Sequence, residues 1–257
     1  MSDDILSRRR GAVRLLTINR PARRNALTIL AAETLRAELA AAIADEQTGA
    51  VVLTGAGGHF SAGGDGAEIV AAAEGDPDAP ARLMQVFHQL VDTVWTAPLP
   101  VVAAVSGVAY GGGFNLALAC DLVVCSADTR FCQVFVRRGL VPDLGGAYLL
   151  PRLVGLQRAK QLMLLAPEIG AAHALQLGLV NAVLPEPGAA LQHALTLAGQ
   201  LAAGHRPAIA QAKTLLNAST GGSLSESLEL EAGIQTALLR SEPVRRSFAD
   251  FRAGRDG

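Results

Sequence analysis

Two glycine-rich segments contain the residues of this chain best suited to chemistry. One runs from Gly55 to Gly66 (GAGGHFSAGGDG) and the other from Ser106 to Gly113 (SGVAYGGG), and we call them the first and second glycine loops. Backbone N–H groups at a turn that opens a helix have no intrahelical partner, and glycine lets an anionic oxygen approach them closely. Because both loops follow apolar runs typical of buried strands, they could converge on one oxygen. The sequence therefore predicts an oxyanion hole.

The elements that position the two loops follow a strand, turn, helix order. Runs rich in valine and alanine predict buried strands at Ala50–Thr54 and Val101–Val105, directly before the loops. A helix is predicted after the second loop, at Phe114–Cys120, and the repeated order indicates an α/β core with a helical C-terminal part. The other predictions are strands at Val13–Asn19, Leu122–Cys125 and Arg130–Phe135, helices at Thr28–Ala44 and Ala81–Trp95, a turn at Leu140–Gly146 before a helix ending near Pro151, and mainly helical sequence from Leu156 onward.

The composition bounds the class of protein. The chain has 257 residues, half of them hydrophobic, and a net charge of −1, which indicates a folded protein that does not bind nucleic acid. Its three cysteines lack CxxC spacing, so neither a disulfide framework nor a zinc site is expected, and we predict no metal. No signal peptide or membrane-spanning run is recognisable, so we expect a soluble cytoplasmic protein without a membrane partner.

Six blocks of sequence resemble the crotonase superfamily, which is also called the enoyl-CoA hydratase/isomerase superfamily. In chain order they are NRPARRNAL, HFSAGGD, PVVAAVSGVAYGGG, ACDLVVCSADTRF, GLVPDLGGAYLLPRLVG and ALQLGLVNAVLP, which begin at Asn19, His59, Pro100, Ala119, Gly139 and Ala174. The resemblance implies a right-handed spiral of ββα turns at residues 1–195 and a helical region at residues 196–257 that builds a homotrimer or a dimer of trimers. It also implies an acyl-CoA thioester substrate, and no cofactor beyond the coenzyme A that is part of this substrate.

The resemblance also assigns roles by position. The two backbone donors of the family's oxyanion hole fall on Gly64 and Gly112, in agreement with the prediction from the glycine loops alone. Such donors stabilise the negative charge that develops on a thioester oxygen, and losing one typically costs roughly 3–4 kcal/mol of barrier. The positions near coenzyme A in the family fall on Arg23, Arg24, Ala26, Ala62, Asp65 and Ile69.

The sequence departs from the hydratases of this family at two positions. Hydratases carry glutamates where this chain has Asn115 and Phe135, and neither side chain can act as a general base, so ordinary hydration is not expected. The carboxylate left in the matching region is Asp143, and several isomerase branches resemble this chain in carrying an aspartate there. Burial beside Phe135 and Leu140 is expected to raise the pKa of Asp143. The main hypothesis is an enoyl-CoA isomerase in which Asp143 moves a proton from C2 to C4.

Other interpretations stay open. Asp143 could instead belong to a turn or cap the helix that begins near Leu144. Asn115 could contact substrate, although a helix-surface amide is preferred. Phe135 is expected in the acyl-pocket wall or the core. His88 falls where 4-chlorobenzoyl-CoA dehalogenases place a histidine base, so His88 and Asp143 could together support attack on an aryl-CoA and hydrolysis of the ester. An acyl-CoA-binding protein without turnover and a residual enoyl-CoA hydratase are further alternatives, because a fold does not fix a function.

Overall fold

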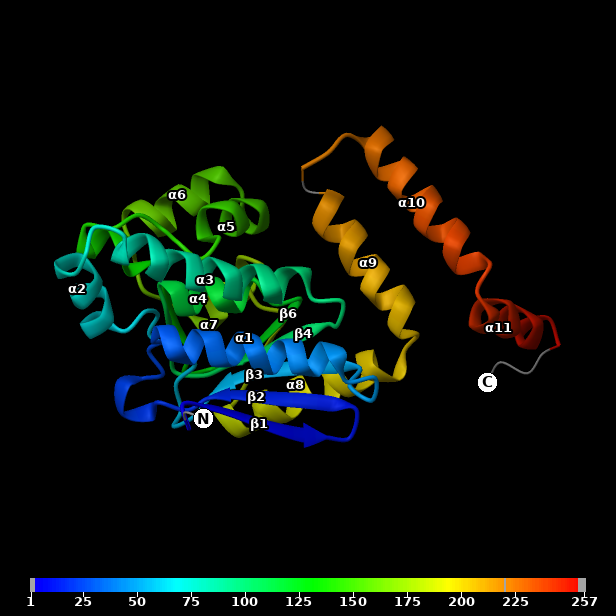
Figure 1. Ribbon diagram of the computed structural model, residues 1–257, viewed down its shortest axis with the longest axis horizontal. Helices are drawn as coiled ribbons and strands as arrows, with labels where there is room; N and C mark the ends of the chain where they lie inside the picture. The colour runs from blue at the N-terminus through cyan, green and yellow to red at the C-terminus, as the bar shows by residue number, and fades with distance from the viewer. Residues whose placement is uncertain (1–2, 220, 254–257) are drawn as a thin grey trace. The chain divides into compact units, whose positions relative to one another are not determined.

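The computed structural model describes residues 3–219 and 221–253 of the chain (Figure 1). The chain divides into two compact units, Met1–Gly204 and His205–Gly257. The division predicted after residue 195 falls inside α8 (Pro187–Ala203), which packs on the sheet of the first unit. Among the described residues, no helix combines the length and the apolar character that crossing a bilayer requires.

A six-stranded sheet forms the centre of the first unit. Its first two strands pair antiparallel, and all other neighbours pair parallel. Because β3 and β4 are parallel neighbours, the two glycine loops leave adjacent strands at the same edge of the sheet. In spatial order the strands are β1 (Ile5–Arg10), β2 (Val13–Ile18), β3 (Ala50–Gly55), β4 (Val101–Val105), β6 (Leu122–Ser126) and β9 (Ala182–Leu184).

Helices cover both faces of this sheet (Figure 1). Alternate residues of a strand point to opposite faces, so Val51 and Leu53 of β3 pack in a core with α1 and α3. Ala50 and Val52 of the same strand pack in a second core with α8. Burial on both faces explains why the central strands read as continuous apolar runs. The helices on the first side are α1 (Ile29–Ala44) and α3 (Ala79–Thr96), and α2 (Gly66–Glu74) lies between them in sequence.

A second, three-stranded sheet carries the end of the second glycine loop. It contains β5 (Val108–Tyr110), β7 (Arg130–Cys132) and β8 (Ile169–Gly170). After Gly111 the chain enters α4 (Gly112–Leu118), which is buried along its whole length. The first unit also contains the 3-10 helices η1 (Pro21–Arg23) and η2 (Val134–Arg138) and the helices α5 (Gly146–Val154), α6 (Leu156–Leu164) and α7 (Ala171–Gln176).

The second unit is helical. Its helices are α9 (Arg206–Ser219), α10 (Leu224–Leu239) and α11 (Glu242–Arg252), and α10 contacts both of the others. A capping box starts α10, since Ser223 and Glu226 each bond the backbone N–H of the other. The unit leaves apolar side chains uncovered, including Leu216, Leu224, Leu228, Phe248 and Phe251.

Most predicted elements are confirmed, and β1, β7 and α5 are among those that differ from the prediction. The pattern of apolar residues does not predict β1, because this edge strand carries three consecutive arginines at its exposed end. The strand predicted at Arg130–Phe135 ends at Cys132, and the 3-10 helix η2 follows it. The helix α5 continues past Pro151 to Val154, because a proline there removes only one backbone hydrogen bond from a helix anchored by buried leucines.

Candidate active site

The two glycine loops meet where they leave the sheet. Ser61 of the first loop forms a parallel bridge with Ala109. The Ser61 carbonyl accepts the Tyr110 N–H at 2.9 Å, and the Ser61 N–H donates to the Val108 carbonyl at 3.1 Å. A Cβ atom built on Gly113 would lie 2.3 Å from the Ser61 oxygen, so this close approach requires glycine. The predicted convergence of the two loops is confirmed.

The N–H groups of Gly64 and Gly112 lie at this meeting point. Leu27 bonds the two neighbours of Gly64: its N–H donates to Gly63 at 2.7 Å and its carbonyl accepts Asp65 N–H at 2.8 Å. This pairing turns the Gly64 N–H away from Leu27. Gly112 begins α4, so its N–H has no intrahelical acceptor, and within the described residues neither glycine N–H donates to the protein. A Cβ atom on Gly63 would lie 3.2 Å from Gly112 N, so the two loops are in contact here.

Asp143 brings a carboxylate to the second of these donors. A Cβ atom built on Gly112 would lie 3.7 Å from Asp143 Oδ1. This oxygen is buried and has no hydrogen-bond partner in the described part of the chain. Burial raises the pKa of Asp143 to about 6, against a smaller lowering by the residue's own backbone N–H. A carboxylate with a raised pKa beside a backbone N–H that has no protein acceptor is suited to general acid and base catalysis.

The Asp143 side chain does not cap the helix that follows it. The N-cap of α5 is Gly145, and the Gly146 N–H donates to the Asp143 carbonyl rather than to its carboxylate. Asp143 therefore opens a turn, as one form of the alternative predicts, but its side chain is not a helix cap. Phe135 is buried as expected, whereas Leu140 is 46% exposed.

Asn115 is fully buried, so the preferred prediction of a helix-surface amide is wrong. That prediction assumed a helix with one solvent face, whereas α4 is buried on every side. Asn115 Nδ2 donates to the Asp143 carbonyl at 2.8 Å, and Asn115 Oδ1 accepts Gln133 Nε2 at 2.7 Å. Both polar ends of the amide are therefore used within the protein, next to the candidate base.

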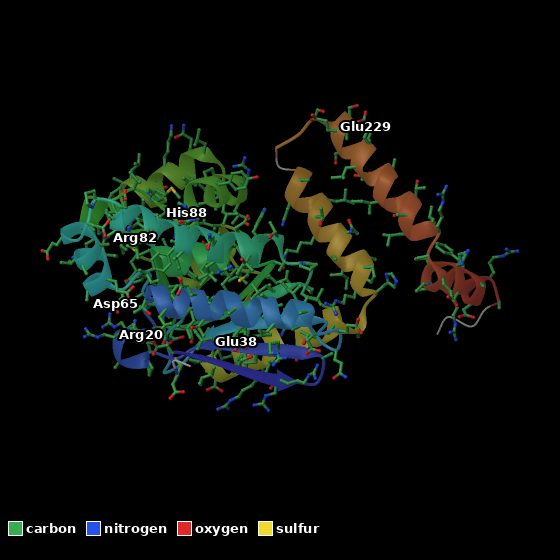
Figure 2. All side chains as sticks on the ribbon, in the orientation of Figure 1. Arg20, Glu38, Asp65, Arg82, His88 and Glu229 are labelled. Atoms are coloured by element: carbon green, nitrogen blue, oxygen red, sulfur yellow. The ribbon has the colours of Figure 1, made fainter. Side chains whose placement is uncertain are left out.

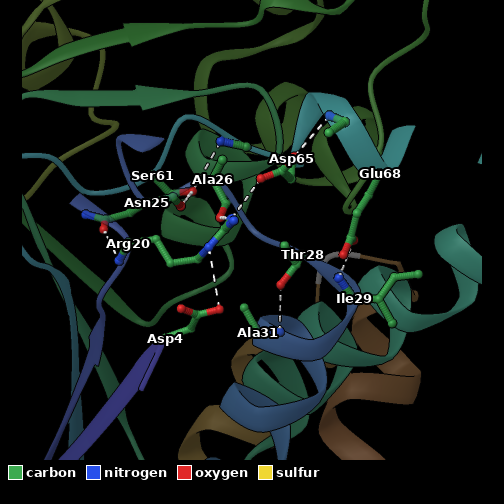
Figure 3. Close-up of polar contacts among 12 residues, drawn as sticks. Asp4, Arg20, Asn25, Ala26, Thr28, Ile29, Ala31, Ser61, Asp65 and Glu68 are labelled. Atoms are coloured by element: carbon green, nitrogen blue, oxygen red, sulfur yellow. Dashed lines mark hydrogen bonds and ion pairs between the residues drawn. The ribbon is translucent and has the colours of Figure 1, made fainter. Parts of the chain in front are cut away.

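Arg20 joins several segments around the first glycine loop (Figure 3). Its Nη1 lies 2.9 Å from Asp65 Oδ2 and donates to the Ala26 carbonyl at 2.5 Å, and its Nε lies 3.5 Å from Asp4 Oδ2. Asp65 Oδ1 accepts the Ala67 N–H at 3.0 Å and caps α2. Burial raises the pKa of Asp65, but the bonds from Arg20 and Ala67 outweigh it and hold this pKa below its ordinary value. The Arg20–Asp65 pair thus anchors α2 beside Gly64.

The basic turn before this loop has an unusual backbone. Arg24 and Asn25 have φ angles of 49° and 56°, in the left-handed region that non-glycine residues seldom adopt. Asn25 Nδ2 donates to two carbonyls of the first glycine loop, at 2.8 and 2.6 Å. The Arg24 carbonyl accepts the Ala62 N–H at 2.9 Å. These bonds join the turn to the loop and leave the side chains of Arg23 and Arg24 exposed.

The helix α3 presents Phe87, rather than His88, to Gly64. A Cβ atom built on Gly64 would lie 3.9 Å from Phe87 Cε2 and 3.2 Å from Ile69 Cδ1. His88 is exposed on α3 (Figure 2). Within the residues that the structure places, no hydrogen bond or ion pair joins His88 to Asp143. The described residues therefore give the predicted pair of His88 and Asp143 no hydrogen bond or ion pair to work through.

Sequence reasoning missed three residues of this site. Arg20 stands inside the matched block that begins at Asn19, and its place directly before Pro21 was the available signal. Gln133 is an isolated amide between apolar residues, and nothing in its surroundings marks it. Gly146 contacts Asn115 and belongs to a glycine pair that was read only as a turn. In the described ranges, no three His, Cys, Asp or Glu side chains gather as a metal site would need.

The chain is similar to known proteins along nearly its whole length. The model of the enoyl-CoA hydratase/isomerase family matches residues 8–256. A Rhodobacter capsulatus protein named probable enoyl-CoA hydratase is 39% identical, over 93% of this chain and 88% of its own length. The 1,2-epoxyphenylacetyl-CoA isomerase of Escherichia coli is 33% identical, over 99% and 97%. An enoyl-CoA hydratase crystal structure from a Polaromonas species superposes with a TM-score of 0.93 at 35% identity, covering 98% of this chain and 97% of its own. The predicted crotonase-like α/β fold is thereby confirmed.

Proposed function

Because this chain belongs to the enoyl-CoA hydratase/isomerase family, we propose that it is an enoyl-CoA isomerase that uses Asp143 as both base and acid. The observation that carries the proposal is the place of the Asp143 carboxylate. Its Oδ1 is buried, lacks a protein partner among the described residues and lies next to Gly112, at the meeting point of the two glycine loops.

We propose the following reaction. The thioester oxygen of a 3-enoyl-CoA accepts the N–H groups of Gly64 and Gly112, and Asp143 removes a proton from C2. The electron pair of that C–H bond forms an enolate, whose negative oxygen the two donors stabilise. Asp143 then returns the proton at C4, and the double bond moves into conjugation with the thioester. A pKa of about 6 leaves Asp143 mostly ionised at neutral pH while making it a stronger base than an exposed aspartate.

Hydration is the reaction named for several relatives, and the side chains of this site argue against it. Water addition needs a group that activates water and a group that protonates the α-carbon. Asn115 cannot exchange a proton in this way and has both polar ends bonded to the protein, and Phe135 is apolar. A single carboxylate suffices for a proton shift, because the same group takes and returns the proton.

Two further expectations complete the proposal. Arg23 and Arg24 are exposed on the turn bonded to the first glycine loop, and we assign them to the phosphates of coenzyme A. The second unit exposes large apolar side chains, and we propose that they are covered in a homotrimer or a dimer of trimers. The reaction needs no cofactor, since the proton and the enolate are both handled by the protein.

Replacing Asp143→Asn tests the proposed base. Asparagine keeps the shape but cannot take a proton, so turnover of a 3-enoyl-CoA is expected to fall by about three orders of magnitude, and acyl-CoA binding should persist. Turnover is followed by the absorbance of the conjugated thioester, and binding is measured by calorimetry. Retained turnover in this variant would refute the role of Asp143. If the natural protein hydrates a 2-enoyl-CoA faster than it isomerises a 3-enoyl-CoA, the proposed activity becomes that of a hydratase.

His88→Ala separates this proposal from the dehalogenase-like alternative. Because His88 is exposed and shows no bond to Asp143, isomerisation should be unchanged. Release of halide from a halobenzoyl-CoA by the natural protein, lost in His88→Ala, would favour the alternative. Tight binding of 3-enoyl-CoA by the natural protein with no spectral change would instead indicate a binding protein without turnover.

A further inference from the structure

We propose that Asn115 and Gln133 form a buried chain of amides that fixes the backbone of Asp143 and so sets where its carboxylate meets the substrate. Both are positioning residues, and the inference rests on the proposed role of Asp143. The bonds are 2.8 Å from Asn115 Nδ2 to the Asp143 carbonyl and 2.7 Å from Gln133 Nε2 to Asn115 Oδ1. The two side chains are 0% and 1% exposed, so bulk water does not compete for these bonds.

The chain of amides has only one possible direction. The Asp143 carbonyl can only accept, so Asn115 must turn its NH₂ group toward it. Asn115 Oδ1 then faces Gln133, which must in turn offer its own NH₂ group. This order leaves Gln133 Oε1 at the far end, and that oxygen is buried without a partner in the described part of the chain. A donor is therefore required at position 115, and an acceptor of the same shape cannot replace it.

The start of α5 is built around this amide. The Asp143 carbonyl also accepts the Gly146 N–H at 2.9 Å, so both of its lone pairs are used. A Cβ atom built on Gly146 would lie 2.3 Å from Asn115 Nδ2, so the helix begins directly against the Asn115 side chain. Helix, amide and Asp143 backbone therefore hold one another in place.

The Asp143 carboxylate has to be positioned through its backbone. Its Oδ1 has no protein partner in the described residues, so no other side chain holds this oxygen in place. Neutral amides can fix the backbone without adding a charge, whereas an arginine or lysine in the same place would lower the pKa of the base. Because a misplacement of about 1 Å in a catalytic group can cost roughly 100-fold in rate, loosening this chain should reduce kcat more than substrate affinity.

Two substitutions at Asn115 and one matched control test the inference. In Asn115→Ala and Asn115→Asp, kcat for isomerisation should fall roughly 30- to 100-fold, with KM changed by less than about threefold. The control is Asn181→Asp. Asn181 Oδ1 accepts the Val123 N–H at 2.7 Å, and aspartate can accept equally well, so kcat should be unchanged. Gln133→Leu, which removes only the second bond, should lower kcat by about tenfold and serves if the Asn115 variants fail to fold.

A titration without substrate separates this inference from the proposed function. The carbon-13 signal of the Asp143 carboxyl, followed against pH in the free protein, should titrate at a lower pH in Asn115→Ala, because the loosened loop admits water. If the natural protein does not isomerise 3-enoyl-CoA but this shift occurs, the proposed function fails and the positioning role stands. The positioning role is overturned if Asp143→Asn abolishes turnover but the folded Asn115 variants keep the kcat and the Asp143 titration of the natural protein. If the Asn115 variants do not fold, the same result in Gln133→Leu overturns it.

Discussion

The two glycine loops support neighbouring backbone donors in different ways. The second loop leads into α4, in which all residues from Gly112 to Leu118 are buried, so packing holds its donor in place. The first loop leads into α2, which has no buried residue. Its donor is held by the ion pair between Arg20 and Asp65 and by the hydrogen bonds around it.

This difference indicates how each half of the proposed oxyanion hole can be altered. A donor held by packing responds to changes of volume and little to pH or salt. A donor held by partly buried charges responds to changes of charge and hydrogen bonding. Three of the four predictions below test this contrast and one tests Asp143 beside it, in order from the largest expected effect to the smallest.

The largest contrast lies between one glycine of each loop. Gly113→Ala would place a Cβ atom 2.3 Å from the Ser61 carbonyl oxygen, so a loss of more than about 4 kcal/mol, or failure to fold, is expected. Gly66→Ala meets no atom within 4 Å at the exposed start of α2 and should stabilise the protein by up to about 1 kcal/mol. Urea unfolding of both variants measures the difference. Similar free energies of unfolding would show that packing does not hold the second loop.

The second largest effect is expected from removing Arg20, which pairs with Asp65 beside the first glycine loop. Arg20→Ala leaves Asp65 without its ion pair at a site where only 12% of the aspartate side chain is exposed, so a loss of about 3 kcal/mol is expected. Amide hydrogen exchange should rise in α2 and stay slow in α4. Arg82→Ala is the control, because Arg82 pairs with Asp76 on an exposed surface, where solvent screens the pair, and its loss should change stability far less. Equal effects of the two substitutions would contradict the claim that the Arg20–Asp65 ion pair holds the first glycine loop.

The raised pKa of Asp143 predicts a pH-dependent stability. Burial raises this pKa from 3.8 to about 6, so the folded state binds the proton more tightly than the unfolded state does. Ionising Asp143 therefore destabilises the fold as pH rises from 3.8 to about 6, and the full cost remains above that range. Asp143→Asn should be more stable than the natural protein by about 2–3 kcal/mol near neutral pH, with no advantage below about pH 4. Chemical unfolding at several pH values measures this, and a difference independent of pH would contradict it.

The smallest effect is expected from Asp65→Asn. Asparagine keeps the cap on α2, because its side-chain oxygen still accepts the Ala67 N–H, but it loses the charge that pairs with Arg20. A loss of about 1 kcal/mol near neutral pH is expected. Since the pKa of Asp65 is lowered in the folded state, the advantage of the natural protein should disappear on acidification below the ordinary value of 3.8. Thermal unfolding against pH is the measurement, and an advantage that persists in acid would exclude the ion pair as its source.

Local sequence patterns predicted the strands and loops well because each carries its own signal. Val101–Val105 is apolar throughout and forms β4, and Thr28 caps α1 by accepting the Ala31 N–H at 3.0 Å. Glycine pairs after such strands indicated where the two loops would meet. These signals come from residues that are close together in the chain, so the sequence alone is enough to detect them.

The contacts between distant segments could not be predicted in the same way. Gln133 and Asn115 are far apart in sequence, and their bond depends on how β7 and α4 pack. The burial of Asn115 follows from the elements packed around α4 rather than from the residues next to it in the sequence. The raised pKa of Asp143 was predicted, but the 46% exposure of Leu140 was not.

Burial on both faces of the sheet also bears on how proteins of this kind can change length. A shift of β3 by one residue would exchange the side chains on its two buried faces. Insertions or deletions that move either glycine loop along its strand should therefore disrupt the packing of both cores. Residues 75–78, between α2 and α3, are exposed and carry no such restriction. Length variation in this short connection can therefore alter the segments next to Gly64 and leave the strands that carry both donors in register.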